Sequence, residues 1–234
     1  MEQVYQFFAN LFNALVVELE YAKVLMPSLM QGLIVTLKIF ILTLVMSLPL
    51  GLPFALGSNS KRAIIRIPCR VYIWLFRGTP LMLQLFFFYF FLPIVSGIKL
   101  DGFTTAVFTF VLNYAAYFAE IYRGGIESID RGQYEASQSL GLSRTQTLFG
   151  IIIPQMLKRV LPPISNETIT LVKDTALVSV IAVGELIRVA RGAVNRDVKV
   201  TAFVIAAIIY LILTFILTLL SNYLEKRFSR HESQ

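Results

Sequence analysis

The sequence predicts an all-α integral membrane protein with about five transmembrane helices. Of its 234 residues, 56% are hydrophobic, a larger share than soluble globular domains usually contain. The stretch Thr201–Leu220 carries no charged residue and is long enough to cross the ~30 Å hydrocarbon core of a bilayer as a helix. Charged residues gather between such apolar stretches, as expected for the loops that join membrane spans. We therefore expect a multi-pass protein of the cell membrane, inner or plasma, surrounded by lipid.

Charge and the rare residue types exclude several classes of function. The formal net charge of +7 would suggest a nucleic-acid partner in a soluble protein. In a membrane protein the same excess is expected from basic cytoplasmic loops, so no nucleic acid is predicted as a partner. Cys69 is the single cysteine and His231 the single histidine, so the sequence predicts no disulfide, metal site or catalytic residue. Residues 1–20 lack a basic start and a small-residue cleavage pattern, so no cleavable signal peptide is expected.

The chain is expected to form one transmembrane domain, residues 1–234, beginning with a helix over residues 1–26. Apolar residues recur there at helical spacing but are interrupted by polar ones, which favours a helix lying in the membrane interface. The first span should run from about Pro27 to Leu56. Pro49 and Pro53 should kink its far end, because proline removes a backbone hydrogen bond and clashes with the preceding turn.

The second and third spans complete the region 27–122. A basic cluster after the first span marks the cytoplasmic side, so the N-terminus should lie outside. This cluster consists of Lys61, Arg62, Arg66 and Arg70. The second span runs from about Ile64 to Pro93 and is broken at Arg77–Pro80, where backbone polar groups become available at membrane depth. Such breaks are tolerated only against protein or a cavity, which makes this a candidate for the transport pathway. Phe103–Tyr122 is the third span.

The second half of the chain should hold a cytoplasmic loop at 123–163, spans four and five within 164–224, and a cytoplasmic tail at 225–234. The fourth span, Ile164–Val189, carries several charges and is poorly suited to face lipid. The loop after it would lie outside although it is basic. We keep this orientation because the basic residues of the other loops and of the tail fall on the opposite side. The fifth span is Thr201–Leu220.

Between spans three and four lies a polar, helix-prone stretch, Glu135–Pro154, interrupted by Gly141. Tyr134–Leu140 favours a helix before the glycine. After it, Ser143 is a candidate N-cap with Gln146 three residues on, the pattern of a capping box. We expect two short helices joined at the glycine, and name this stretch the elbow. It contains no nucleophile–base pair or metal cluster, so docking to another protein is predicted rather than chemistry.

The elbow resembles the conserved cytoplasmic loop of ABC importer permeases, whose pattern is Glu-Ala-Ala, three residues, Gly, nine residues, Ile, any residue, Leu-Pro. The residues that match at this spacing are Glu135, Ala136, Gly141, Ile151 and Pro154. Ser137 and Ile153 replace the second alanine and the leucine. Three further segments are similar to polar amino-acid permeases of the histidine, arginine and glutamine type. They are RGTPLMLQLFFFYFFLP at Arg77–Pro93, AEIYRGGIESI at Ala119–Ile129 and LVKDTALVSVI at Leu171–Ile181.

This resemblance implies the type I ABC importer permease fold, with the elbow as the coupling helix that docks into a groove of an ATPase subunit. The coupling residues it implies are Tyr134, Glu135, Ala136, Ser137, Leu140, Gly141, Leu142 and Arg144. The implied partners are a cytoplasmic ATP-binding cassette ATPase dimer, a second copy of the chain or a homologous permease, and an extracellular or periplasmic amino-acid-binding protein. The sequence contains no Walker-type phosphate loop. ATP and Mg are therefore expected on the partner ATPase, with no cofactor and no ATPase activity in this chain.

Two spans carry the candidate substrate contacts. In the third, Asn113, Tyr117 and Glu120 share one helix face, where they could hold an ammonium or guanidinium group. The alternative is that Glu120 pairs with Arg77 or Lys173 to hold the helices together.

The fourth span has Asn166, Thr170 and Lys173 on one face with Asp174 beside them. Glu185, eleven residues beyond Asp174, is expected on nearly the same face. An internal Lys173–Asp174 ion pair is an equally good interpretation.

An amino acid needs a cation for its α-carboxylate and an anion for its α-ammonium group. Arg77 and Lys173 offer the first, and Glu120 and Asp174 the second. The predicted substrate-binding residues are therefore Arg77, Thr79, Asn113, Tyr117, Glu120, Asn166, Lys173 and Asp174.

The further acids Glu167, Glu185 and Asp197 favour a basic amino acid, with glutamine or glutamate as alternatives. An ion-coupled secondary transporter is less favoured, because no inverted repeat is found.

Overall fold

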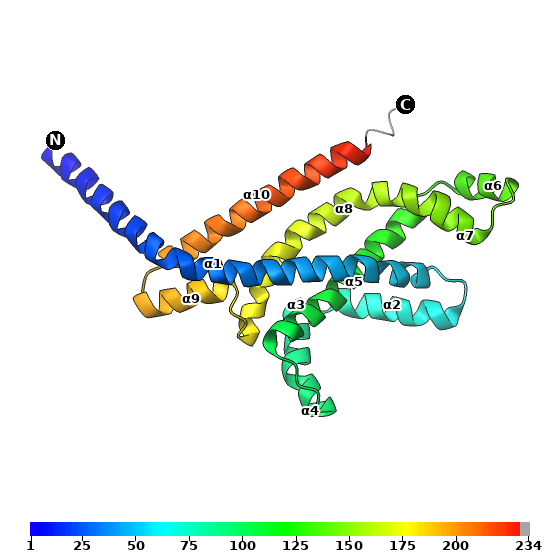
Figure 1. Cartoon of the computed structure of the whole chain (residues 1–234), viewed down its shortest axis with the longest axis horizontal. Helices are drawn as coiled ribbons and strands as arrows, with labels where there is room; N and C mark the ends of the chain where they lie inside the picture. The colour runs from blue at the N-terminus through cyan, green and yellow to red at the C-terminus, as the bar shows by residue number, and fades with distance from the viewer. Residues whose placement is uncertain (230–234) are drawn as a thin grey trace.

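The computed structural model describes residues 1–229, without the side chains of residues 3, 4, 8, 9, 11, 14, 15 and 229. Over these residues the protein contains helices and no strand, as predicted (Figure 1). The helices are α1 Glu2–Ser58, α2 Ala63–Gly78, α3 Leu81–Phe86, α4 Leu92–Ser96, α5 Gly102–Glu127, α6 Arg131–Ser139, α7 Arg144–Thr147, α8 Ile153–Asp174, α9 Leu186–Asp197 and α10 Thr201–Ser229. Short π-helical turns, Phe87–Phe91 and Leu148–Ile152, and a 3₁₀ helix, Thr175–Ile181, join some of them. His231 and residues 230–234 of the predicted tail lie outside the described residues.

Helix α1 is longer than the predicted first span. It runs without interruption from Glu2 to Ser58 and passes through three prolines, so no break separates residues 1–26 from the span. Its N-terminal end projects beyond the other helices (Figure 1). Leu25 is buried and Tyr21 half-buried against α9 and α10, so the last turns before the predicted boundary belong to the packed body. An interfacial position for residues 1–26 stays a prediction.

Helix α5 is the centre of the packed body and lies against α1. Phe110, Tyr114 and Phe118 are almost completely buried on it. The two helices approach closely at Gly51 of α1, where an added Cβ would lie 3.0 Å from the backbone nitrogen of Ala119. Small residues allow this kind of contact between membrane helices, because backbones can then pack directly.

The second predicted span is broken where the sequence indicates. Helices α2 and α3 are separated by Thr79 and Pro80, and the axis bends by 106° between Ala63–Gly78 and Leu81–Ser96. Pro80 has no N–H to donate to a carbonyl of the preceding turn, so the helix cannot continue through it. The predicted break at Arg77–Pro80 is therefore confirmed, and its place in the transport pathway stays a prediction.

The fourth predicted span is not one helix, and this prediction is wrong. Helix α8 starts earlier, at Ile153, continues through Pro162 and Pro163, and ends at Asp174. The chain then turns through the 3₁₀ helix, and α9 begins after Glu185.

The side chain of Glu185 fixes the start of the new helix α9 by capping it. Its carboxylate accepts hydrogen bonds of 2.7 Å from the N–H groups of both Ile187 and Arg188. Tyr210 of α10 lies 3.3 Å from the same carboxylate. Glu185 therefore does not share a helix face with Asp174, contrary to expectation.

Three helical stretches among the described residues are long and apolar enough to cross a membrane. They are Val16–Ser58, Gly102–Glu127 and Thr201–Phe228, and the bent pair α2–α4 makes a fourth if it counts as one span. Helix α8 is not among them, because it carries five charged residues: Lys158, Arg159, Glu167, Lys173 and Asp174. The count of five spans thus stays a prediction.

The elbow folds as predicted. Helix α6 ends with Gly141 at a positive φ of 73°, which glycine adopts without the strain a Cβ would cause. The N–H groups of Gly141 and Leu142 bond back to the carbonyls of Gln138 and Ser137 at 3.0 and 3.1 Å, closing the helix end. Ser143 and Gln146 then form the predicted capping box that starts α7.

A polar cluster at the other end of the molecule ties α1 to the turn between α9 and α10. Tyr21 donates a 2.7 Å hydrogen bond to Asp197, and Arg196 pairs with the same carboxylate. The Arg196 guanidinium, together with this hydroxyl, lowers the pKa of Asp197 to about 2. Lys199 pairs with Glu18 at 3.2 Å. The Asp197 carboxylate therefore joins α1 to the end of α9.

The close contact between α1 and α5 predicts that Gly51→Val destabilises the protein. A side chain there would meet backbone atoms that cannot move aside, and overpacking of this kind typically costs about 1–3 kcal/mol. Gly124→Val is the matched control, because an added Cβ at Gly124 meets nothing within 4 Å. In thermal unfolding of the detergent-solubilised protein, Gly51→Val should unfold several degrees below the control. Equal midpoints would contradict the packing described.

Candidate functional site

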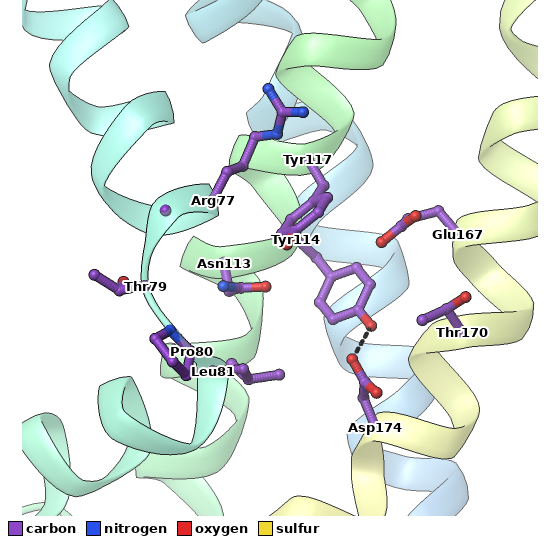
Figure 2. Close-up of a pocket in the computed structure, with 11 residues that line it drawn as sticks. Arg77, Thr79, Pro80, Leu81, Asn113, Tyr114, Tyr117, Glu167, Thr170 and Asp174 are labelled. Carbon is purple, nitrogen blue, oxygen red and sulfur yellow. Dashed lines mark hydrogen bonds between the residues drawn. The ribbon is translucent and has the colours of Figure 1, made fainter.

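A cavity of about 560 Å³ lies where the broken segment α2–α3 faces α5 and α8 (Figure 2). Its walls come from parts of the chain that are far apart in sequence. The lining residues are Arg77, Gly78, Thr79, Pro80, Leu81, Asn113, Tyr114, Tyr117, Glu167, Thr170 and Asp174. A volume of this size lies within the ~300–1,000 Å³ range typical of small-molecule sites.

Two amide side chains satisfy two of the carbonyl groups at the helix break, those of Phe76 and Thr79. Gln84 Nε2 lies 2.8 Å from the carbonyl oxygen of Phe76 and 3.1 Å from that of Thr79. Asn113 Nδ2 donates to the Phe76 carbonyl at 3.1 Å and to Gln84 Oε1 at 3.0 Å. Both amides are buried, with 8% and 3% of Gln84 and Asn113 exposed. Since unpaired backbone groups are costly at membrane depth, this network allows the break to exist.

Three ionisable side chains of opposite sign line the cavity. Arg77 comes from the end of α2, and Glu167 and Asp174 come from α8, two turns apart. Asp174 accepts a 2.8 Å hydrogen bond from the Tyr114 hydroxyl, drawn as a dashed line in Figure 2. Among residues 1–229, no hydrogen bond or ion pair reaches the Glu167 carboxylate. The cavity therefore offers one cation and two anions, one of them unpaired.

Five of the eight predicted substrate residues line this cavity: Arg77, Thr79, Asn113, Tyr117 and Asp174. Asn113, however, uses its amide nitrogen for the helix break.

Asn166, Lys173 and Glu120 are not among the lining residues. Asn166 and Lys173 are exposed on another side of α8, because consecutive helical residues point about 100° apart. The structure contains no Lys173–Asp174 ion pair over the described residues. Glu120 lies further along α5 and pairs with Arg123 and Arg77, so the second alternative, an internal ion pair, describes it better.

The sequence predicts Glu167 only as a further acid near the site, and it does not predict Tyr114 or Gln84 as site residues. Glu167, Thr170 and Asp174 follow the i, i+3, i+7 spacing of one helix face, and this periodicity could have selected them together. The extra acids Glu185 and Asp197 do not line the cavity. Gln84 could have been selected because it is the one amide in an apolar run, four residues after the proline that breaks the helix.

The elbow exposes most of its predicted coupling residues. Tyr134, Glu135, Ala136, Leu140, Gly141 and Arg144 are exposed, and Leu140 retains 78% of its accessible surface. Ser137 is instead buried and donates to the Gln133 carbonyl at 2.6 Å. Leu142 is half-buried and lines a second cavity of about 660 Å³ beside Lys61 of the α1–α2 turn. The elbow thus exposes an apolar side chain, Leu140, among polar residues, and we call the surface around Leu140 the tip of the elbow.

Comparison with known proteins assigns the chain to a family. Residues 47–230 match the family described as binding-protein-dependent transport system inner membrane component. The chain belongs to this family. The matched residues include the helix break, the cavity and the elbow. The permease is accordingly a multi-pass membrane protein of the ABC importer type.

Individual relatives agree with this assignment. The permease is 40% identical over 207 residues to the L-cystine transport system permease protein TcyB of Bacillus subtilis, covering 88% of each chain. It is 39% identical over 209 residues to the arginine transport system permease protein ArtQ of the same organism, covering 88% of the permease and 94% of ArtQ. A crystal structure of an amino acid ABC transporter with histidines matches with a TM-score of 0.83 and 36% identity, over 89% of the permease and 97% of that chain.

The shared hydrogen bonds predict that Gln84 and Asn113 act as one unit. Gln84→Leu and Asn113→Leu each remove one of the two donors to the Phe76 carbonyl and the bond between the two amides. The carbonyl is left unsatisfied, at a cost of about 1–3 kcal/mol, only in the double variant, so its loss of stability should differ from the sum of the single losses. A double-mutant cycle on thermal unfolding measures this difference. Strictly additive losses would show that the two amides do not form one network.

Proposed function

We propose that this permease is the membrane-spanning subunit of an ABC importer that translocates a basic amino acid, with arginine, lysine and histidine as the candidates. The observation that carries the proposal is the cavity with Arg77 on one wall and Glu167 and Asp174 on the opposite wall. No other cavity described for residues 1–229 is lined by one basic and two acidic side chains.

The charges of the cavity complement a cationic amino acid. The Arg77 guanidinium is suited to the α-carboxylate, which it can bind through two parallel hydrogen bonds. Asp174, already oriented by Tyr114, is suited to the α-ammonium group. The unpaired Glu167 carboxylate is left for a positively charged side chain. One cation against two anions gives the cavity a net negative charge, which favours a substrate with a net charge of +1.

The relatives support an amino acid but differ in its type. ArtQ belongs to an arginine transport system and TcyB to an L-cystine transport system, so identity near 40% alone does not choose between them. A zwitterionic substrate would need only one of the two carboxylates. The unpaired Glu167 is therefore what favours a basic substrate over glutamine or glutamate, the alternatives.

We further propose that a separate ATPase dimer drives transport through the elbow. The exposed tip around Leu140 and the rigid turn at Gly141 suit docking into a groove of another protein. ATP and Mg would be bound by that ATPase. Two permease copies, or this chain and a homologue, would face the two ATPase subunits. An extracellular or periplasmic binding protein would deliver the amino acid.

In this arrangement the whole loop 123–163, which contains the elbow, lies in the cytoplasm, and the N-terminus lies outside. Transport would then proceed by alternating access, with the helices exposing the cavity to one side of the membrane at a time. An ion-coupled secondary transporter, the alternative class, does not agree with the family match over residues 47–230.

The proposed substrate roles predict a selective loss of affinity in Glu167→Gln. Removing this carboxylate deletes a charge-assisted contact worth about 1.5–3 kcal/mol, so arginine should bind about ten-fold more weakly or worse. Glutamine binding should change little. Isothermal titration of arginine and glutamine into the purified permease–ATPase complex, without the binding protein, measures both affinities. Glu225→Gln on α10 is the control for charge removal. Unchanged arginine affinity in Glu167→Gln would overturn the basic-substrate proposal.

The proposed coupling role predicts that Gly141→Pro separates ATP hydrolysis from uptake. Proline is fixed at φ near −65° and cannot adopt the positive φ of Gly141, so the elbow must change shape. Gly141→Asn is the control, since asparagine tolerates this conformation. In proteoliposomes with ATPase and binding protein, Gly141→Pro should hydrolyse ATP with little uptake, whereas Gly141→Asn should retain uptake. Equal uptake by the two variants would argue against the elbow as the coupling element.

A further inference from the structure

Arg77 contacts two different groups at the edge of the cavity. Its guanidinium lies 5.6 Å from the ring centroid of Tyr117, a cation–π contact with another lining residue. Nη1 of Arg77 lies 3.5 Å from Oε1 of Glu120. In Figure 2 the side chain extends away from Thr79 and Pro80. The cation proposed to bind the substrate carboxylate is therefore already held by a carboxylate of the protein.

Glu120 has a stronger partner of its own. Arg123, one turn further along α5, donates from Nε to Oε2 of Glu120 at 3.0 Å and from Nη2 to Oε1. Arg123 also pairs with Glu127 at 2.7 Å. Two parallel hydrogen bonds orient the Glu120 carboxylate toward Arg123, and the contact with Arg77 is a single, longer one. Loss of Arg77 would thus leave Glu120 neutralised.

We propose that Glu120 is a positioning residue that holds Arg77 while the cavity is empty and yields it to the α-carboxylate of the bound amino acid. This inference rests on the proposed function, in which Arg77 binds that carboxylate. The exchange is feasible because the Arg77 and Glu120 side chains are 39% and 27% exposed, and ion pairs this open to solvent are weak. Glu120 is then a competitor of the substrate and makes no contact with the substrate ammonium group.

If Glu120 competes for Arg77, its removal should strengthen arginine binding, whereas if Glu120 contacts the substrate directly, its removal should weaken it. Removing an acid near the cavity weakens the binding of a cationic ligand through its field alone, and a lost direct contact weakens it further. Removing a competitor for Arg77 instead strengthens binding, and only for ligands that carry an α-carboxylate. L-Arginine and L-argininamide differ in this group, so the pair separates the two cases.

The experiment titrates both compounds into the purified permease–ATPase complex without the binding protein. In Glu120→Gln, the dissociation constant of arginine should fall by about two- to five-fold, the effect expected from a weak, partly exposed ion pair. The dissociation constant of argininamide should not fall. Glu127→Gln is the matched control, because Glu127 pairs with Arg123 but not with Arg77, and it should tighten neither ligand. Glu120→Asp keeps the charge but is shorter by one methylene, so it should tighten arginine to a smaller degree.

Weaker or unchanged arginine binding in Glu120→Gln would overturn the proposal, as would equal tightening of both compounds. If Glu120→Gln does not fold, Glu120→Asp decides in the same way. The wild-type complex separates this outcome from a failure of the proposed function. If the wild type binds arginine and Glu167→Gln weakens that binding, but Glu120→Gln does not tighten it, only the positioning role of Glu120 is overturned. Absence of arginine binding to the wild type would remove both.

Discussion

The structure depends on the satisfaction of backbone carbonyls where the second membrane segment breaks. Hydrocarbon offers no water to the freed groups, so the bend of 106° between α2 and α3–α4 requires donors from within the protein. Gln84 supplies them from α3 and Asn113 from α5, and the two amides are joined to each other. The same hydrogen bonds fasten α2 and α3 to α5. The break can therefore form one wall of a cavity and still be rigid enough to place Arg77 there.

Two helices connect this cavity with the elbow. Helix α5 contributes Asn113, Tyr114 and Tyr117 to the cavity region and ends shortly before α6 begins. Helix α8 starts directly after the elbow and ends at Asp174, in the opposite wall. Each helix thus has one end beside the elbow and carries cavity residues along its length. A force applied to the elbow would reach α8 through unbroken helical backbone, and would reach α5 across the short turn of residues 128–130.

The sequence predicts those features that depend on local chemistry. Gly141, Ser143 and Gln146 predict the elbow because helix capping is decided within a few residues, and Pro80 predicts the break for the same reason. Features that depend on packing between distant segments are predicted less well. Asp174 and Lys173 are equally polar in the sequence, and only the rotation of α8 against α5 turns the first into the cavity and the second away. Glu185 lies on no helix face shared with Asp174, because α8 has already ended and its side chain caps the next helix, which charge counting does not reveal.

We propose that one cavity at the helix break binds an amino acid and that the elbow, which adjoins α5 and α8, contacts the ATPase. Cryo-electron microscopy of the permease–ATPase complex with arginine tests both parts at once. We expect density for the amino acid between Arg77 and the carboxylates of Glu167 and Asp174, with Leu140 seated in a groove of the ATPase. Arginine bound outside this cavity, or an elbow that makes no contact with the ATPase, would contradict it.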